Sequence, residues 1–138
     1  MMDERFLCRG KRKDNGEWVD GNLVYTRTTT LGVVTEIYTL EMSYQVIPET
    51  VGQCTGLKDK NGKLIFEGDI VEYMDAYSDC NGEYTEFMNE GEVAYEDGSY
   101  FITNRSSVEM SDIVYKGKLD GNIIGNIHDN PELLEVER

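Results

Sequence analysis

The chain contains few side chains of the types that build catalytic or metal-binding sites. Its single histidine is His128, and its three cysteines, Cys8, Cys54 and Cys80, lie far apart in the sequence. A zinc site needs several such ligands at short spacings, and nucleophilic catalysis needs a base beside the nucleophile. Scattered, odd-numbered cysteines also do not form a disulfide framework, and reduced thiols are typical of the cytoplasm. We therefore expect a cytoplasmic protein that is not an enzyme, with no catalytic residues, no cofactor and no metal site.

Carboxylates are the most abundant chemical groups of the chain, which has a formal net charge of −14. Lys and Arg are absent between Lys63 and Arg105, whereas Asp and Glu occur throughout this interval. A basic protein would be attracted to such a stretch. The sequence predicts an acidic partner surface formed by Glu67, Asp69, Glu72, Asp75, Asp79, Glu83 and Glu86.

Two acidic stretches, Asp59–Gly62 and Asp79–Glu83, superficially resemble calcium-binding loops. Aligning their glycines with the invariant glycine of an EF-hand places Leu57 or Tyr77 at the first position, where a working loop needs a carboxylate. The EF-hand interpretation is therefore rejected. An enzyme that uses a metal from solution, with Asp69, Glu72 and Asp75 as ligands, is kept as an alternative function.

Basic side chains gather near the N-terminus. Together with an aromatic residue they form a candidate nucleic-acid patch that comprises Arg5, Arg9, Lys11, Arg12, Lys13 and Trp18. Small barrels bind single strands through such cations and stacking rings. Strand alternation, however, places Arg12 on one face and the other cations on the opposite face, where acidic residues of the same chain would pair with them. The net charge also argues against general binding to nucleic acid or to anionic membranes.

Turn signals between alternating segments indicate an antiparallel, mainly β protein. Asn15-Gly16, Asn61-Gly62 and Asp97-Gly98 are dipeptides that tolerate the positive φ of two-residue hairpin turns. A further pair of strands is expected within residues 28–47, with a loop near Leu31-Gly32. Residues 75–90 are polar and predict a long mobile loop or an exposed β-excursion.

Helix signals are confined to the C-terminal end of the chain. Asn130 and Pro131 are suited to the N-cap and first position of a helix, and Glu132 follows them. A short helical turn is predicted there. No apolar run approaches the roughly 20 residues that span a bilayer, so no membrane association is expected.

Three segments of the chain share a pattern with a known family. They are the hairpin Arg9–Gly21, the long run Val46–Val71 and the segment Ile124–Leu134. In these segments the chain resembles the YopX family of phage and prophage proteins, over about residues 5–134, which suggests one domain for residues 1–138. The resemblance implies a β-rich fold with a small SH3-like barrel and a phage or prophage origin in a bacterial host cell. It implies no catalytic residues, because the family has none that are agreed.

These observations favour a phage accessory protein of unknown molecular function that binds protein. The expected partner is a host or phage protein, or a second copy of the chain in a homo-oligomer, because sheet edges and long hairpins invite strand pairing between copies. The alternatives are a nucleic-acid-binding barrel that uses the N-terminal hairpin and a metal-assisted enzyme that uses the acidic segment.

Overall fold

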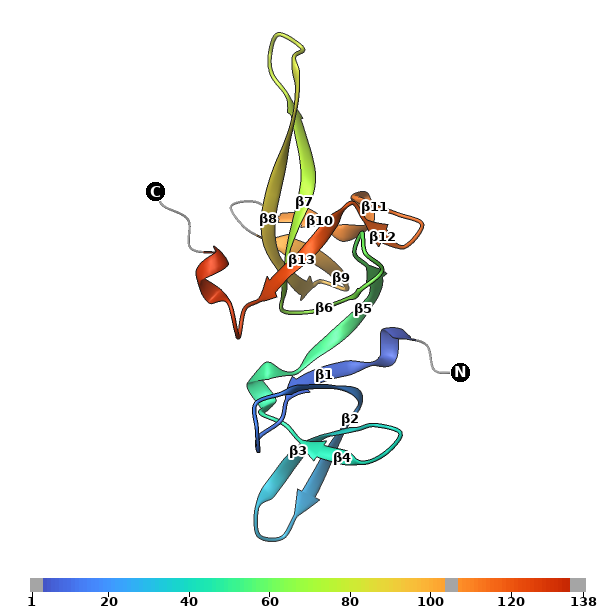
Figure 1. Ribbon diagram of the computed structural model, residues 1–138, viewed down its shortest axis with the longest axis vertical. Coiled ribbons are helices and arrows are strands. Elements are labelled where there is room, and N and C mark those ends of the chain that lie inside the picture. The colour runs from blue at the N-terminus through green and yellow to red at the C-terminus, as the bar shows by residue number, and fades with distance from the viewer. Residues whose placement is uncertain (1–3, 104–106, 135–138) are drawn as a thin grey trace. The chain divides into compact units, whose positions relative to one another are not determined.

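The computed structural model describes residues 4–103 and 107–134, and it confirms that the chain is mainly β. The chain divides into two compact units, Met1–Thr55 and Gly56–Arg138, which are treated separately below. Figure 1 shows the elements of both units in chain order. The assignment of the whole chain to one domain stays a prediction.

The first unit is an antiparallel sheet with short helical turns at its margins. Its strands pair in the order β5-β1-β2-β3-β4. The elements are η1 (Glu4–Phe6), β1 (Cys8–Lys11), β2 (Trp18–Thr28), β3 (Gly32–Tyr38), β4 (Ser43–Gln45), η2 (Pro48–Thr50) and the first part of β5 (Gly52–Lys58). Ile37, Val46 and Cys54 are its buried apolar side chains.

Strand β2 changes partner at Gly21, where the alternation of the sequence breaks. Residues Trp18 to Gly21 pair with β1, whereas Asn22 to Thr28 pair with β3. A Cβ atom at position 21 would collide with the backbone oxygen of Tyr38. Glycine is therefore required here because two backbones approach closely.

The second unit contains a five-stranded antiparallel sheet in the order β10-β9-β8-β7-β13. The last part of β5 pairs with β6 and, in parallel, with β12. The elements are β6 (Leu64–Phe66), β7 (Asp69–Ser78), β8 (Tyr84–Glu96), β9 (Ser99–Thr103), β10 (Ser107–Glu109), η3 (Met110–Asp112), β11 (Val114–Tyr115), β12 (Lys118–Leu119), β13 (Gly121–Asn126) and η4 (Pro131–Leu134). One buried cluster forms its core and comprises Ile65, Val71, Tyr73, Val93, Ile102, Met110 and Leu119.

Turns are present at all three predicted dipeptides, and so is the C-terminal helical turn, but only Asp97-Gly98 is a two-residue hairpin turn. The connections at Asn15-Gly16 and Asn61-Gly62 are longer, and only their glycines have positive φ. The Asp97-Gly98 turn between β8 and β9 has positive φ at both residues, 49° and 86°, as a two-residue hairpin requires. Pro131–Leu134 forms a single 3-10 turn. The pair of strands expected within residues 28–47 is present, because β3 pairs on one side with β2 and on the other with β4.

The expected SH3-like barrel is not confirmed. Strands β10 and β13 lie at the two ends of the five-stranded sheet, and in residues 4–103 and 107–134 no strand pairing closes this sheet into a barrel. Long-range strand order decides closure, and turn residues, which were the basis of the sequence analysis, specify only neighbouring strands.

Candidate functional site

The β7–β8 hairpin extends beyond the rest of its sheet as a two-stranded ribbon, which we define as residues 74–88 (Figure 1). Strand β13 pairs with β7 only as far as Tyr73, and β9 pairs with β8 only from Glu92 onward. Between these limits the two strands pair with each other, from Met74 opposite Met88 to Ser78 opposite Tyr84. The β-excursion expected within residues 75–90 is thus formed by two long strands and a tight turn.

Large apolar side chains are exposed along the ribbon. Because successive side chains alternate between the faces of a strand, Met74, Met88 and Tyr84 share one face, and Tyr77 and Phe87 share the other. The rings of Tyr77 and Phe87 meet edge to face with their centroids 5.9 Å apart. All five side chains are nevertheless exposed to solvent. Such a group of large apolar side chains is unusual on an exposed surface.

The base of the ribbon is fixed by a polar contact group. The amide of Asn89 donates to the carboxylate of Asp75 at 3.1 Å and lies 3.3 Å from the hydroxyl of Tyr73. Burial raises the pKa of Tyr73, and the negative charge of Asp75 raises it further. The hydroxyl of Tyr73 therefore stays protonated at neutral pH. The contacts of Asn89 with Tyr73 and Asp75 hold the two strands together at the base of the ribbon.

The acidic residues predicted as a partner surface separate into two sets. Asp75, Asp79, Glu83 and Glu86 lie on the ribbon, whereas Glu67 and Glu72 are half-buried outside it, in the bend before β7 and in β7 itself. Asp69 is only 1% exposed, and its carboxylate accepts the backbone N–H of Phe66 at 2.7 Å. Contrary to the sequence-based expectation, Asp69 therefore belongs to no surface. It closes the bend around Gly68, where a short acidic side chain can bond the backbone of its own turn.

The predicted basic patch is distributed over both faces of the N-terminal hairpin. Arg9 and Lys11 lie over the ring of Trp18, at 4.8 Å and 5.7 Å from its centroid. Arg12 stacks on Tyr44 at 4.2 Å and forms an ion pair with Asp14 at 2.6 Å. The expected alternation holds for these three cations, and part of the charge is compensated within the chain.

The remaining two cations of the patch lie outside the strands of the hairpin. Arg5 belongs to the η1 turn, and Lys13 is exposed in the turn that follows β1. The structure therefore brings together Arg9, Lys11 and Trp18, whereas Arg12 lies over Tyr44 instead. The Arg12–Asp14 contact raises the pKa of Arg12 and lowers that of Asp14, mainly through their hydrogen bonds.

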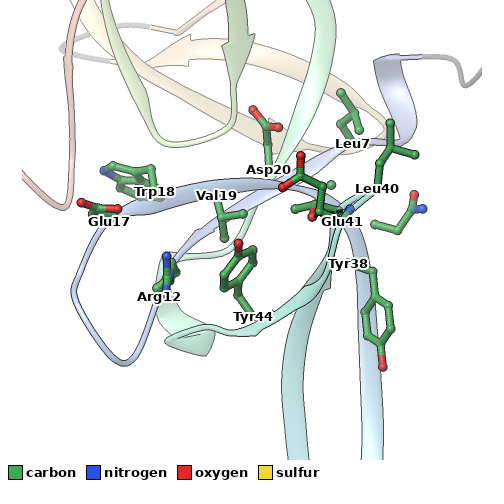
Figure 2. Close-up of a pocket in the computed structure, with 13 residues that line it drawn as sticks. Leu7, Arg12, Glu17, Trp18, Val19, Asp20, Tyr38, Leu40, Glu41 and Tyr44 are labelled. Atoms are coloured by element: carbon green, nitrogen blue, oxygen red, sulfur yellow. Dashed lines mark hydrogen bonds between the residues drawn. The ribbon is translucent and has the colours of Figure 1, made fainter.

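A pocket of about 780 Å³ opens beside this hairpin within the first unit (Figure 2). One wall is the start of β2, and the other is the loop between β3 and β4. The lining residues are Leu7, Arg12, Glu17, Trp18, Val19, Asp20, Gly21, Asn22, Tyr38, Thr39, Leu40, Glu41 and Tyr44. Its volume lies within the usual range for small-ligand sites.

Titratable groups with metal-binding or nucleophilic character are dispersed. In residues 4–103 and 107–134, no group of three His, Cys, Asp or Glu side chains is arranged to hold a metal ion. His128 lies in a tight turn in which the side chain of Asn126 accepts the backbone N–H groups of His128 and Asp129. Cys54 is buried, Cys8 is half-buried and Cys80 is exposed at the tip of the ribbon.

Sequence reasoning missed the apolar side chains of the ribbon and the far wall of the pocket. The sequence signal for the ribbon was available, since bulky residues recur among the acids from Met74 to Met88. The pocket left no comparable signal. Leu40 and Glu41 lie about 20 residues after Asp20 and reach the same pocket only through the pairing of β2 with β3.

The comparisons with known proteins agree with this architecture. The family model described as YopX protein matches residues 7–135. The chain belongs to the YopX family. Among solved structures, the crystal structure of protein EF1440 from Enterococcus faecalis is similar, with 29% sequence identity and a TM-score of 0.51, over 93% of this chain and 96% of that chain. No curated protein matches the chain significantly. Within the described residues, no helix is long and apolar enough to span a membrane.

Proposed function

We propose that this YopX protein is a non-enzymatic accessory module of a phage or prophage that acts in the bacterial cytoplasm by binding another protein. The β7–β8 ribbon is the contact element, and its partner is a basic protein segment that contains apolar residues. The single observation that carries this proposal is the ribbon itself: five large apolar side chains are exposed on two strands that no third strand covers. Exposed apolar clusters of this kind are characteristic of interaction sites.

The charge of the ribbon supports a basic partner. Residues 74–88 contain four carboxylates, those of Asp75, Asp79, Glu83 and Glu86, and neither Lys nor Arg. Complementary charge accelerates encounter and selects the partner, whereas apolar contacts supply most of the affinity. Two copies of the ribbon would repel each other, so a second protein fits this surface better than a second copy of the chain.

Affinity capture from host cells tests the proposal. Three forms of the full-length chain are used as bait: the wild type, a ribbon variant with Met74→Ser, Phe87→Ser and Met88→Ser, and a control variant with Tyr25→Ser and Val33→Ser. The control replaces exposed apolar residues of the first unit. The candidate protein is then purified, and its affinity is measured at about 50 mM and 300 mM salt.

We expect a basic protein that binds the wild type and the control, loses binding to the ribbon variant, and binds more weakly at the higher salt concentration. Equal capture by all three forms overturns the proposal. Light scattering after size-exclusion chromatography adds a second criterion. An oligomer of the wild type that the ribbon variant does not form would assign the ribbon to self-assembly instead.

Each of the two alternative functions has its own test. For nucleic acid, fluorescence anisotropy with single-stranded and duplex oligonucleotides at low salt compares the wild type with Lys11→Ala and Arg12→Ala. For a metal-assisted enzyme, thermal stability with and without added divalent cations compares the wild type with Glu72→Ala and Asp75→Ala. The structure favours neither alternative, because the cations of the hairpin lie over its own aromatic rings and Asp69 is buried in a structural contact.

A further inference from the structure

Strand β2 has a partner on one side only after Gly21. Residues 22–28 pair with β3, whereas β1, on the opposite side of β2, pairs only as far as Gly21. Within residues 4–103 and 107–134, no segment bonds to the backbone of β2 on that side beyond Gly21. The β2–β3 hairpin runs from there to its turn at the foot of Figure 1. Residues 22–28 therefore form an open sheet edge, which we call the β2 edge.

The hydrogen bonds of β3 show which backbone groups lie open at the β2 edge. The carbonyl of Thr35 in β3 accepts the N–H of Val46 at 3.0 Å, on the side of β3 that faces β4. In an antiparallel ladder the N–H and C=O of one residue point to the same side, and successive residues alternate. Tyr25 lies opposite Thr35, so its N–H and C=O point away from β3, and so do those of Arg27. Both residues therefore offer a donor and an acceptor at the open edge.

The β2 edge lacks most of the features that keep sheet edges from pairing. Exposed edges usually carry lysine, proline or a bulge, or another segment covers them. Residues 22–28 contain no proline, they pair with β3 without a shift in register, and Arg27 is their only charged side chain. Tyr25 is 64% exposed although it is aromatic. Valine, tyrosine and threonine also favour extended strands, so this edge is suited to accept a further strand.

The β2 edge of a second copy fits this edge in one antiparallel register. With Thr26 of both copies on a two-fold axis, Tyr25 of each copy lies opposite Arg27 of the other. Because both residues point their backbone groups outward, each such pair exchanges two hydrogen bonds. Residues directly opposite each other share a face of the sheet, so the guanidinium of Arg27 also reaches the ring of the opposite Tyr25. An axis at Arg27 would instead oppose two like charges, and an axis at Tyr25 would place Arg27 opposite Leu23.

The distribution of charge along the chain also favours a second copy at this edge. Residues 1–55 contain six Lys and Arg against eight Asp and Glu, so the first unit carries a formal charge of only −2 out of the total of −14. Repulsion between two copies is therefore weak at the β2 edge, in contrast to the acidic ribbon. A two-fold contact also closes on itself, so that neither copy keeps an open β2 edge.

We infer that two copies of the chain pair antiparallel along the β2 edge and form a symmetric dimer in which one sheet runs through both first units. The four backbone hydrogen bonds and the two contacts between Arg27 and Tyr25 are the interactions that hold the dimer together. This inference concerns the first unit and is independent of the partner proposed for the ribbon.

Sedimentation equilibrium of the full-length protein tests the dimer, at concentrations up to about 1 mM, where even a millimolar dissociation constant is measurable. We expect a dimer of the wild type. Thr26→Lys and Thr26→Glu each place two like charges opposite each other on the axis, and each should weaken the dimer by about tenfold. An equimolar mixture of the two variants brings opposite charges together there and should restore the affinity of the wild type. Restoration also shows that both variants are folded.

The matched controls are Gln45→Lys and Gln45→Glu, which should dimerise as the wild type does. Gln45 is exposed on β4 in the same sheet, and like Thr26 it neighbours Glu36. Hydrogen exchange followed by NMR adds a measurement on the backbone. Exchange of the amides of Tyr25 and Arg27 should slow as the protein concentration rises, whereas that of Val24, whose N–H points toward β3, should not change.

Several results would overturn the inference. These are a wild type that stays monomeric at the highest concentration, equal effects of the substitutions at positions 26 and 45, and a mixture that associates as weakly as its components. Protection of the Tyr25 and Arg27 amides only on addition of a captured host protein would assign the β2 edge to a foreign strand instead. The ribbon variant defined above should dimerise normally, so failure here is distinguishable from failure of the proposed function.

Discussion

The loops Asp59–Lys63 and Asp79–Glu83 are two copies of one turn in different surroundings. Both read Asp-x-Asn-Gly-x. In each, the aspartate Oδ1 accepts the backbone N–H groups of the asparagine and of the fifth residue, all at 2.9 Å. In each, the backbone N–H of the aspartate also donates to the carbonyl of the fifth residue, at 2.8 Å and 2.9 Å respectively. Turn geometry therefore follows from the local sequence alone.

The surroundings of the two turns differ. Asp59 is 3% exposed, and its Oδ2 also accepts the backbone N–H of Ile123 in β13, at 3.2 Å. Asp79 is exposed at the tip of the ribbon. The comparison teaches that the same hydrogen bonds serve to hold a core element in one place and to close a solvent-exposed hairpin in the other.

The largest difference is expected on removal of the two aspartates. Asp59→Ala leaves three partly buried backbone N–H groups without their acceptor, which should lower the free energy of unfolding by about 2 kcal/mol. In Asp79→Ala the N–H groups of Asn81 and Glu83 can bond to water instead, so the free energy of unfolding should fall by about 0.5 kcal/mol or less. Urea denaturation of both variants measures the two losses. Equal losses would show that burial of the turn does not matter.

The two glycines of these turns should behave alike. Gly62 and Gly82 have φ of +84° and +81°, and a Cβ atom at either position would meet no other atom within 4 Å. Alanine therefore introduces only backbone strain, which should cost about 1 kcal/mol at each site. Thermal melts of Gly62→Ala and Gly82→Ala should give matching shifts. A much larger shift for Gly62→Ala would mean that the surroundings act on the backbone of the turn as well as on its side chain.

A smaller effect on stability is expected where burial acts on a single carboxylate instead of on a turn. Burial raises the pKa of Glu92, and the neighbouring Glu67 raises it further. The folded protein thus holds the Glu92 proton at pH values where the unfolded chain has released it, so stability falls as pH rises through the raised pKa. Glu92→Gln should stabilise the protein at pH 7 by less than about 1 kcal/mol, and the gain should vanish below about pH 4.5, the ordinary pKa of glutamate.

The exposed Glu96 lies on the same strand and provides the control for Glu92. Glu96→Gln should change the melting temperature little at any pH between 4 and 8. The pH dependence of the melting temperature of the two variants is the measurement. A gain for Glu92→Gln that is equally large at pH 4 would assign its effect to packing rather than to charge.

Local features of the fold were predictable from the sequence, whereas long-range features were not. The hairpins at Asn15-Gly16, Asn61-Gly62 and Asp97-Gly98 depend on residues that are neighbours in the chain. The pairing of Arg9 with Gly52 and of Lys118 with Lys58 depends on residues more than 40 positions apart, and no short pattern encodes it. The SH3-like barrel was inferred from the family resemblance and not from such pairings.

The candidate sites also combine local features that the sequence shows with long-range features that it does not. The charge of the ribbon was visible in the sequence, and so was the stacking partner Trp18 of the basic hairpin. Burial of Asp69 was not visible, because Glu67-Gly68-Asp69 reads equally well as an exposed acidic turn. The pocket was also not visible, since its two walls become neighbours only when β2 and β3 pair.

Strand β5 has a consequence for how the chain folds during its synthesis. Its first part pairs with β1, so every strand partner of the first unit has left the ribosome once Thr55 emerges, and this sheet can form before the second unit exists. Its last part can pair with β6 soon afterwards, but its pairing with β12 must wait for Lys118, about 60 residues later. During that interval the edge that β12 later covers is unpaired, and the translation rate over residues 59–118 sets how long this edge stays open to strand pairing with other chains.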